Sequence, residues 1–358
     1  MSSNLKTISH SDVSRTGNFY RVAIVGAGSL KGKELSEVLN DRNFPALDVK
    51  LLDDDEALGK IESVGDEVTF IQKLRAEEFH NIDFTFFAGD PESTRKSWKI
   101  ARDAGSDIVD LSYALAVEAD ARAAIRSPWI ERQLGQQVLP DLQPGPVVVA
   151  HPAATVLALL MLRLQKAAKI IRASATVFEP ASEHGQKGMD ELHQQTVNLL
   201  SFQALPKAVF DAQVAFNMLA RYGVQSAPPL SSIEALVREH YRTIAPSAPD
   251  LSVLLLQAPI FHGHAFSVQV EIDKASDLQT IQQSLAGEHI NLVPGAEDAP
   301  SNVSAAGQSD IQLAVLADPG HPERFWLWAT SDNLRVSAAT AVECAESMAT
   351  TRPRGKIQ

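Results

Sequence analysis

The chain of 358 residues carries 32 Lys and Arg against 44 Asp and Glu, a formal charge of −12 at pH 7, and 45% of its residues are hydrophobic. A chain of this length and apolar content is expected to fold as more than one domain. Its charge excludes unaided binding to nucleic acid or to an anionic membrane, since no stretch gathers enough Lys and Arg to overcome that field. A small molecule or another protein is therefore the expected kind of partner.

The cytoplasm is the expected compartment. No apolar run reaches the roughly 18 residues that span a bilayer, and the N-terminal segment MSSNLKTISHSDVSRTG lacks a hydrophobic signal core. The single cysteine, Cys344, excludes an internal disulfide and any multi-cysteine metal site, which agrees with a reducing compartment.

The first half of the chain alternates strand and helix patterns. Residues 1–18 are polar and aperiodic and are expected to form a flexible tail. The strand-like segments that follow are, in order, RVAIV, LDVKLLDDD, FTFFAGD, DIVDLS and VVVA, with helical spacing in LKGKELSEVL and ESTRKSWKIARDAG. This alternation predicts a parallel, doubly wound sheet in a Rossmann-type domain over 19–150, with ligands at the carboxyl ends of its strands.

The second half has a different pattern. Helices are expected over 153–167, QKGMDELHQQTVNLLSF and SSIEALVREHYRTI, and strands at IIRASATVFEP, LSVLLLQAP, HAFSVQVEID and FWLWATS. Residues 204–232 and 286–309 contain prolines and small residues and are expected to be loops. These elements predict an α+β domain over 151–334, built on an open, largely antiparallel sheet with helices on one face. An amphipathic helix, RVSAATAVECAESMA, opens the last segment, 335–358.

The glycine-rich stretch GAGSLKG is the first candidate for chemistry. Gly26 would make the tight turn after the first strand, and Gly28 would let backbone amides approach a pyrophosphate at the N-terminus of the following helix. The spacing is GxGxxxG, with the last glycine one place later than in the dinucleotide fingerprint. A strand-to-helix turn without a ligand is the alternative interpretation.

Asp53 ends the second expected strand, at the place where dinucleotide-binding domains keep an acid. Its carboxylate could accept hydrogen bonds from an adenosine ribose and would repel a 2'-phosphate, so NAD is expected rather than NADP. Alternatively, Asp53, Asp54 and Asp55 form a solvated acidic turn, and no nucleotide binds.

The order of these motifs resembles the aspartate-semialdehyde dehydrogenase family, most closely its Usg-like paralogues. The resemblance covers the chain from about residue 20 and rests on GAGSLKG, FAGD, IVDLS, VFEPAS, GQKGMDELHQQT, AFNML, QAPIFHGHA and DNLRVSAATAVECAE. It implies a homodimer with a Rossmann-type NAD-binding domain, an α+β dimerisation domain and a C-terminal helix that returns to the first domain. It also implies cofactor contacts at Ser29, Leu30, Gly89 and Asn333.

The resemblance makes the segment VVVAHPAAT unusual. In working members of the family, the helix after the last Rossmann-type strand begins with an Asn-Cys pair, and the cysteine attacks the substrate carbon. A helix N-terminus suits this role because its dipole favours the thiolate. Here the matching pair is Pro152 and Ala153. A methyl group cannot attack a carbonyl, so the family reaction is not available by its usual route.

The resemblance also matches three substrate positions, and all three are changed. Glu179 stands for the family's glutamine, Ala116 for its phosphate-binding arginine, and Gln257 for the arginine that holds the substrate carboxylate. Loss of one partner of such a charged pair costs of order 2 to 5 kcal/mol in a dry site. An anionic substrate would find few partners.

His264 matches the family's general base. It shares parity with the apolar residues of its strand and so points toward the interior or a cleft. Alternatively it is a packed histidine at the domain seam. His262 has the same parity, but no acid or thiol ligand is placed beside the pair, so no metal is expected. Cys344 is expected to be a buried small hydrophobe, and Thr155 is a poor nucleophile unless a base adjoins it.

Two functions therefore compete. The chain is either a non-catalytic or regulatory homodimer that keeps a dinucleotide site and acts through its dimer surface or a partner protein. Or it is an oxidoreductase on a different substrate, with NAD-dependent hydride transfer and His264 as base. The replacement of every anion clamp favours the first.

Overall fold

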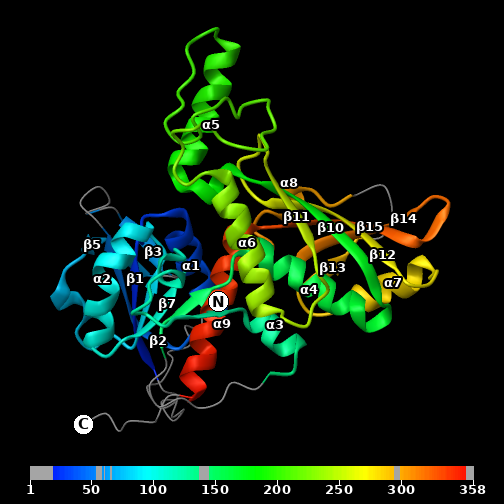
Figure 1. The fold of residues 1–358 in the computed structure, drawn as a ribbon. Coiled ribbons are helices and arrows are strands. Elements are labelled where there is room, and N and C mark those ends of the chain that lie inside the picture. The colour runs from blue at the N-terminus through cyan, green and yellow to red at the C-terminus, as the bar shows by residue number, and fades with distance from the viewer. Residues whose placement is uncertain are drawn as a thin grey trace, which may run out of the picture.

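The computed structural model describes residues 19–53, 59, 61–64, 67–136, 145–293 and 299–351, and these form two main sheets (Figure 1). The predicted tail over 1–18 lies outside the described residues. The strands of the first sheet come from the first half of the chain and those of the second sheet from the second half.

The first sheet is parallel throughout its seven strands, in the order β5-β2-β1-β6-β7-β9-β8. Its strands are β1 (Tyr20–Val25), β2 (Ala46–Asp53), β5 (Gln72–Lys73), β6 (Phe84–Phe87), β7 (Asp107–Asp110), β8 (Ala124–Arg126) and β9 (Val147–Val149). The helices between them are α1 (Leu30–Asp41), η1 (Ala76–Phe79), α2 (Pro91–Asp103), η2 (Ala114–Ala116) and α3 (Pro128–Gln133). The central strand β6 is buried along its whole length, as expected for a sheet covered on both faces. The predicted parallel Rossmann-type sheet is confirmed.

A hairpin of β3 (Ile61–Val64) and β4 (Glu67–Phe70) stands apart from this sheet. The sequence patterns did not predict it, nor the short β5, β8 and α3. Each of these elements is shorter than the windows over which hydrophobic periodicity can be recognised.

The second sheet has six strands in the order β11-β10-β12-β15-β14-β13. Its strands are β10 (Ile170–Glu179), β11 (Ser252–Gln257), β12 (His264–Ile272), β13 (Ile290–Leu292), β14 (Ile311–Asp318) and β15 (His321–Ser331). The β10–β12, β12–β15 and β14–β15 pairs are antiparallel, but β10–β11 and β13–β14 are parallel. The sheet is therefore mixed, because long crossover connections lead into β11 and β14. The prediction of a loop over 286–309 was wrong in part, since this segment contains β13 and the short helix α8 (Asn302–Ala305).

Helices cover one face of this sheet. The helices of this half are α4 (Pro152–Ala167), η3 (Ala181–His184), α5 (Gly185–Leu200), α6 (Leu230–Ile244), α7 (Leu278–Leu285), α8 (Asn302–Ala305) and α9 (Asn333–Thr351). Helix α4 is buried all round from its first residue to Leu164, and it packs against α6, α7 and β10. Helix α5 projects away from both sheets (Figure 1). Among the helices of the described residues, none has the length and apolar character required to cross a bilayer.

The last helix joins the two halves. Helix α9 leaves the end of β15 and packs against α1, α3 and α4 (Figure 1). Several ion pairs fix it on α1 and on Arg42, the residue that follows α1. Among them, Arg335 Nη1 lies 3.0 Å from Glu34 Oε1, and Arg42 Nη1 lies 3.1 Å from Glu343 Oε1. The helix thus returns to the first sheet, as the resemblance implies.

Candidate functional site: a glycine loop and a closed cluster at the start of α4

The glycine loop between β1 and α1 is shaped by close backbone packing. Gly26 has φ +80°, and a Cβ on it would lie 2.2 Å from the Cα of Gly89 in the turn after β6. A Cβ on Gly32, in the first turn of α1, would lie 2.3 Å from the carbonyl oxygen of Gly26. Only glycine fits at these positions. The late third glycine of GxGxxxG is therefore the one that lets α1 pack on the loop.

Asp53 and the glycine loop form one unit. Asp53, at the carboxyl end of β2, accepts a hydrogen bond on Oδ2 from the backbone N–H of Gly28 at 2.7 Å. Ser29 caps α1 by accepting from Gly32 N at 3.0 Å, and its hydroxyl donates to the carbonyl of Ala88 at 2.9 Å. Gly28, Ser29 and Leu30 stay half-buried, so this end of the site keeps contact with solvent.

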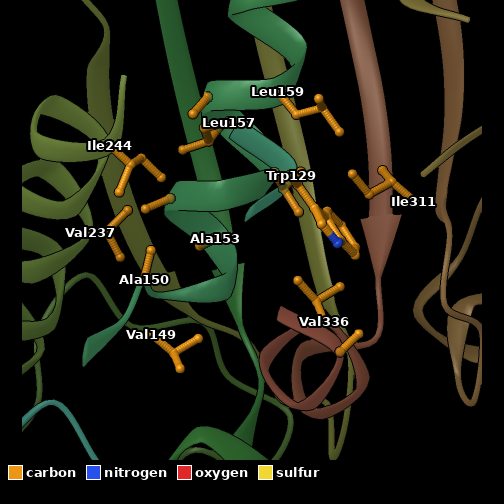
Figure 2. Packing of buried hydrophobic residues seen from close by; sticks show 14 of the residues in the cluster. Trp129, Val149, Ala150, Ala153, Leu157, Leu159, Val237, Ile244, Ile311 and Val336 are labelled. Carbon is orange, nitrogen blue, oxygen red and sulfur yellow. The ribbon is translucent and has the colours of Figure 1, made fainter. Parts of the chain in front are cut away.

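The start of α4 is closed. His151 caps the helix, and its Nδ1 accepts from the N–H of Ala153 at 3.2 Å. The side chains of Ala153 and Ala154 have no solvent exposure. Figure 2 shows Ala153 in the same packed cluster as Val149 and Val237. The first turn thus offers two methyl groups and no nucleophile.

Thr155 is the first hydroxyl of this helix. Its Oγ1 donates to the hydroxyl of Ser127 at 3.3 Å and is fully buried. This hydrogen-bond partner is a serine and not a base, so it does not activate Thr155 as a nucleophile. Cys344 is also fully buried, and burial raises the pKa of its thiol to about 12, so it behaves as the small hydrophobe expected.

His264 and Glu179 form a buried pair. Their Nε2 and Oε2 atoms are 2.9 Å apart, and both residues are inaccessible to solvent. Burial lowers the pKa of His264, but the hydrogen bond to Glu179 and the nearby carboxylates raise it, and the net shift is upward from the ordinary value of a histidine. Burial also raises the pKa of Glu179 from its ordinary value. Within the described residues, neither His264 Nδ1 nor Glu179 Oε1 has a hydrogen-bond partner.

Gln257 lies next to this pair, and its side-chain amide forms hydrogen bonds with other protein groups. Its Nε2 donates to the carbonyls of Glu179 at 3.0 Å and Ala258 at 2.9 Å, and its Oε1 accepts from the hydroxyl of Tyr222 at 2.7 Å. Ala116 is not part of this group. It lies on η2 and packs against the core of the first sheet.

A cluster that the sequence analysis missed connects the glycine loop to this site. Lys31, inside GAGSLKG, places its Nζ 3.9 Å from Glu183 Oε2 on η3. Glu183 Oε1 accepts from the amide of Asn333 at 2.8 Å, and its other oxygen lies 3.9 Å from His151 Nε2. Burial raises the pKa of Glu183, but Lys31, His151 and His264 lower it to about 2. Lys31 lies inside GAGSLKG and Glu183 directly follows VFEPAS, but no sequence pattern links the two residues.

Three possible metal ligands meet in this cluster, since ligand atoms of His151, Glu179 and Glu183 lie within 4.8 Å of one another. Two features oppose a cation there. The Lys31 ammonium already lies beside Glu183. In addition, His151 Nδ1 accepts a hydrogen bond, so in the neutral ring Nε2 carries the proton and has no lone pair for a metal. We assign no metal to these residues.

The HxH pair does not converge on one point. His262 Nε2 lies 2.8 Å from Asp332 Oδ2, whereas His264 turns to Glu179. Asn333, expected beside a nicotinamide, accepts from the N–H of Gly263 at 3.0 Å and from the hydroxyl of Ser182 at 3.2 Å. These side chains hold the start of α9 against the second sheet.

Comparison with known proteins agrees with both halves of the fold. Residues 21–137 match the family described as semialdehyde dehydrogenase, NAD binding domain, and residues 161–336 match semialdehyde dehydrogenase, dimerisation domain. The chain is 31% identical over 337 residues to a USG-1 protein homologue of Azotobacter vinelandii, covering 91% of this chain and 96% of that one. It is 26% identical to an aspartate-semialdehyde dehydrogenase of Rickettsia bellii, covering 92% and 97%.

Solved structures show the same fold. A probable aspartate-semialdehyde dehydrogenase from Pseudomonas aeruginosa is similar with a TM-score of 0.80 and 29% identity, covering 92% of this chain and 98% of that one. Aspartate semialdehyde dehydrogenase II from Vibrio cholerae, complexed with ASA, is similar with a TM-score of 0.79 and 24% identity, covering 93% and 99%.

Proposed function

Because the chain belongs to the semialdehyde dehydrogenase family, we propose that it is a homodimer that binds a dinucleotide but does not catalyse the family's phosphate-dependent oxidation of aspartate semialdehyde. Its role is then binding or regulation. The start of α4 carries this proposal, since Ala153 stands at the position matched to the family's cysteine. Ala154 also ends in a methyl group, so a one-residue shift of the correspondence still leaves no nucleophile.

The two anion-binding positions support the same conclusion. Ala116 has no charge to offer a phosphate. Gln257 is neutral, and both its Nε2 hydrogen bonds and its Oε1 are taken by protein groups. A carboxylate or phosphate at this place would meet the buried Glu179 without a compensating arginine.

Activity assays test the proposal. The parent protein, the Ala153→Cys variant and the Ala154→Cys variant are incubated with aspartate semialdehyde, inorganic phosphate and NAD or NADP. We expect no nucleotide reduction by any of them, because both anion clamps stay absent in the variants. Turnover by the purified parent above that of a mock preparation would refute the proposal; turnover by a variant alone would refute the role given to Ala116 and Gln257.

NAD rather than NADP is the proposed ligand of the glycine loop. The Asp53 carboxylate lies 2.7 Å from the Gly28 N–H, where it would repel a 2'-phosphate. Calorimetric titration at one salt concentration should give tighter binding of NAD. Equal or tighter binding of NADP would contradict this role of Asp53.

The outer face of the second sheet is the proposed dimer surface. Leu316 and Trp326 are cross-strand partners on β14 and β15, and they are 54% and 38% exposed on the face opposite the helices. Leu254 on β11 lies on the same face and is 48% exposed. Sedimentation should show a dimer, and Leu316→Arg with Trp326→Arg should give monomers. Val224→Arg, on a fully exposed loop residue elsewhere, is the control.

The buried His264–Glu179 pair favours a second candidate. A carboxylate that accepts the Nε2 proton orients the ring and leaves Nδ1 as the basic atom, which is the arrangement of a general base. The chain would then be an oxidoreductase that transfers hydride to NAD from a different substrate. His264→Asn should abolish any such NAD reduction found in a screen of alcohols and aldehydes while NAD binding persists. Retained reduction would exclude His264 as the base.

A further inference from the structure

On the basis of the proposed function, we infer that the glycine loop takes only the adenosine diphosphate half of a nucleotide. A cluster of Lys31, Tyr113, Glu183 and Asn333 fills the place of the nicotinamide half. A dinucleotide crosses the carboxyl ends of the strands where the strand order of a doubly wound sheet reverses. Here that point lies between β1 and β6. The adenine half therefore belongs over β1 and β2, and the nicotinamide half over β6 and β7.

Lys31 crosses this point. Its backbone is in the first turn of α1, on the β1 side, but its Nζ donates to the carbonyl of Leu111, directly after β7, at 3.3 Å. The same Nζ lies 3.3 Å from the hydroxyl of Tyr113 and 4.4 Å from the centre of its ring. A lysine and an aromatic ring thus occupy the carboxyl end of β7, where a nicotinamide ring would have to lie.

The second half of the chain closes the cluster from the other side. Glu183 on η3 lies 3.9 Å from Lys31 Nζ and accepts from the amide of Asn333 at 2.8 Å. The ring of Tyr113 lies 5.4 Å from that of His151, which in turn lies 5.8 Å from that of His264. Side chains therefore contact one another continuously from the glycine loop to the position of the retained base.

Burial separates the two halves of the nucleotide site. The inner part of the nicotinamide side is closed, because Asn333 and His264 are 0% exposed and the side chain of Glu183 is 4% exposed, while Lys31 and Tyr113 are half-buried. On the adenine side, Gly28 and Ser29 of the glycine loop are half-buried, and none of the fully buried residues named above lies there. To enter, a nicotinamide ring would have to separate Lys31 and Glu183 from each other and from their hydrogen-bond partners. The cost of breaking these contacts would offset the affinity gained from the ring.

Calorimetry with the unmodified protein tests the inference. ADP-ribose, NAD and nicotinamide mononucleotide are titrated under identical conditions. We expect ADP-ribose and NAD to bind with Kd values within about threefold of each other, and nicotinamide mononucleotide not to bind. Binding of NAD more than about tenfold tighter than ADP-ribose would overturn the inference and leave the proposed dinucleotide site intact. Absence of binding by ADP-ribose and NAD alike would overturn the dinucleotide site as well.

A double variant sharpens the result. Lys31→Ala with Glu183→Gln removes both charges of the pair, so that neither is left buried alone. It should make NAD bind about tenfold tighter than ADP-ribose. Lys33→Ala, on an exposed position of the same helix, is the control and should leave the ratio unchanged. A folded double variant, verified by its thermal melting curve, that keeps the parent's ratio would contradict the inference; if it does not fold, the titrations of the unmodified protein decide.

Discussion

Two strand-to-helix turns lie at the carboxyl ends of strands of the first sheet, and they differ in the contacts that hold them. The turn from β1 to α1 is set by backbone contacts that only glycine allows, such as the approach of Gly26 to Gly89. The turn from β9 to α4 carries the methyl groups of Ala153 and Ala154 and is sealed by apolar packing. Backbone contacts that the fold itself requires therefore fix the first turn, whereas apolar side chains hold the second.

The largest effect is expected from breaking the first turn. Gly26→Ala places a Cβ 2.2 Å from the Cα of Gly89, where no flexible side chain can yield, and at φ +80°. We expect a loss of more than about 3 kcal/mol of unfolding free energy, or no folded protein. Urea denaturation followed by circular dichroism measures it.

Gly105→Ala is the matched control. Gly105 follows α2 with φ +93°, and a Cβ on it meets nothing within 4 Å. It should cost only the strain of a left-handed alanine, about 1 kcal/mol. Equal losses for the two variants would show that φ, and not the contact between the two turns, demands glycine at 26.

The packing around the start of α4 should instead make the stability of the protein depend on pH. His240 Nδ1 accepts the N–H of His151 at 2.9 Å, and burial lowers the pKa of His240 to about 4. Below about pH 6.5, His240 binds a proton in the unfolded chain, but in the folded protein it stays neutral until the pH approaches its lower pKa. The contribution of His240 to the free energy of unfolding is therefore fully present above about pH 6.5 and falls as the pH drops toward 4. At pH 5 the loss from this residue is about 2 kcal/mol.

His240→Asn tests this cause, because its amide oxygen can still accept from His151. Urea midpoints at pH 7.5, 6 and 5 should fall less steeply in the variant than in the parent. His80→Asn, on an exposed residue, should follow the parent. An unchanged slope in His240→Asn would assign the acid sensitivity to other groups.

The same contrast explains what the sequence could predict. Strands β1, β6 and β9 are continuous apolar runs because both faces of the first sheet are covered, and they were found by that pattern. The parallel pairing of β11 with β10 was missed, since it depends on the path of a long connection and not on the composition of either strand. The mixed strand pairing of the second sheet could therefore be recognised only in the structure.

The candidate site divides in the same way. Ala153, Glu179 and His264 could be singled out because each matches one position of a motif. The Lys31–Glu183 contact could not be predicted, because it joins the glycine loop to a residue far along the sequence that belongs to no motif, and each charge by itself resembles a solvated surface residue. Asp53 was expected to face a ribose, but its hydrogen bond to Gly28 became visible only when the loop and β2 were placed together.

A moderate effect is expected on the open end when that acid is removed. Asp53→Ala should weaken NAD binding about tenfold, or ~1.4 kcal/mol, while NADP binding changes less, so the two affinities converge. The Gly28 N–H is half-buried and can bind water instead, so the fold should persist. Asp48→Ala, at an exposed position on the same strand, is the control. A constant NAD to NADP ratio in Asp53→Ala would remove Asp53 from the site.

The smallest effect is expected at the junction of the two halves, on α9. Glu346 pairs with Arg42 at 2.8 Å with both side chains 35% exposed, so Glu346→Gln should change the unfolding free energy by less than about 1 kcal/mol. Glu343, one turn earlier, is 4% exposed and accepts from Trp129 at 3.2 Å and Arg132 at 2.7 Å. Glu343→Gln should therefore cost more, and its loss should shrink less in 0.5 M salt, because the Glu343 carboxylate is buried and a buried charge is screened less. If the two variants lost equal stability with equal salt dependence, apolar packing, and not these two ion pairs, would hold α9 against the first half of the chain.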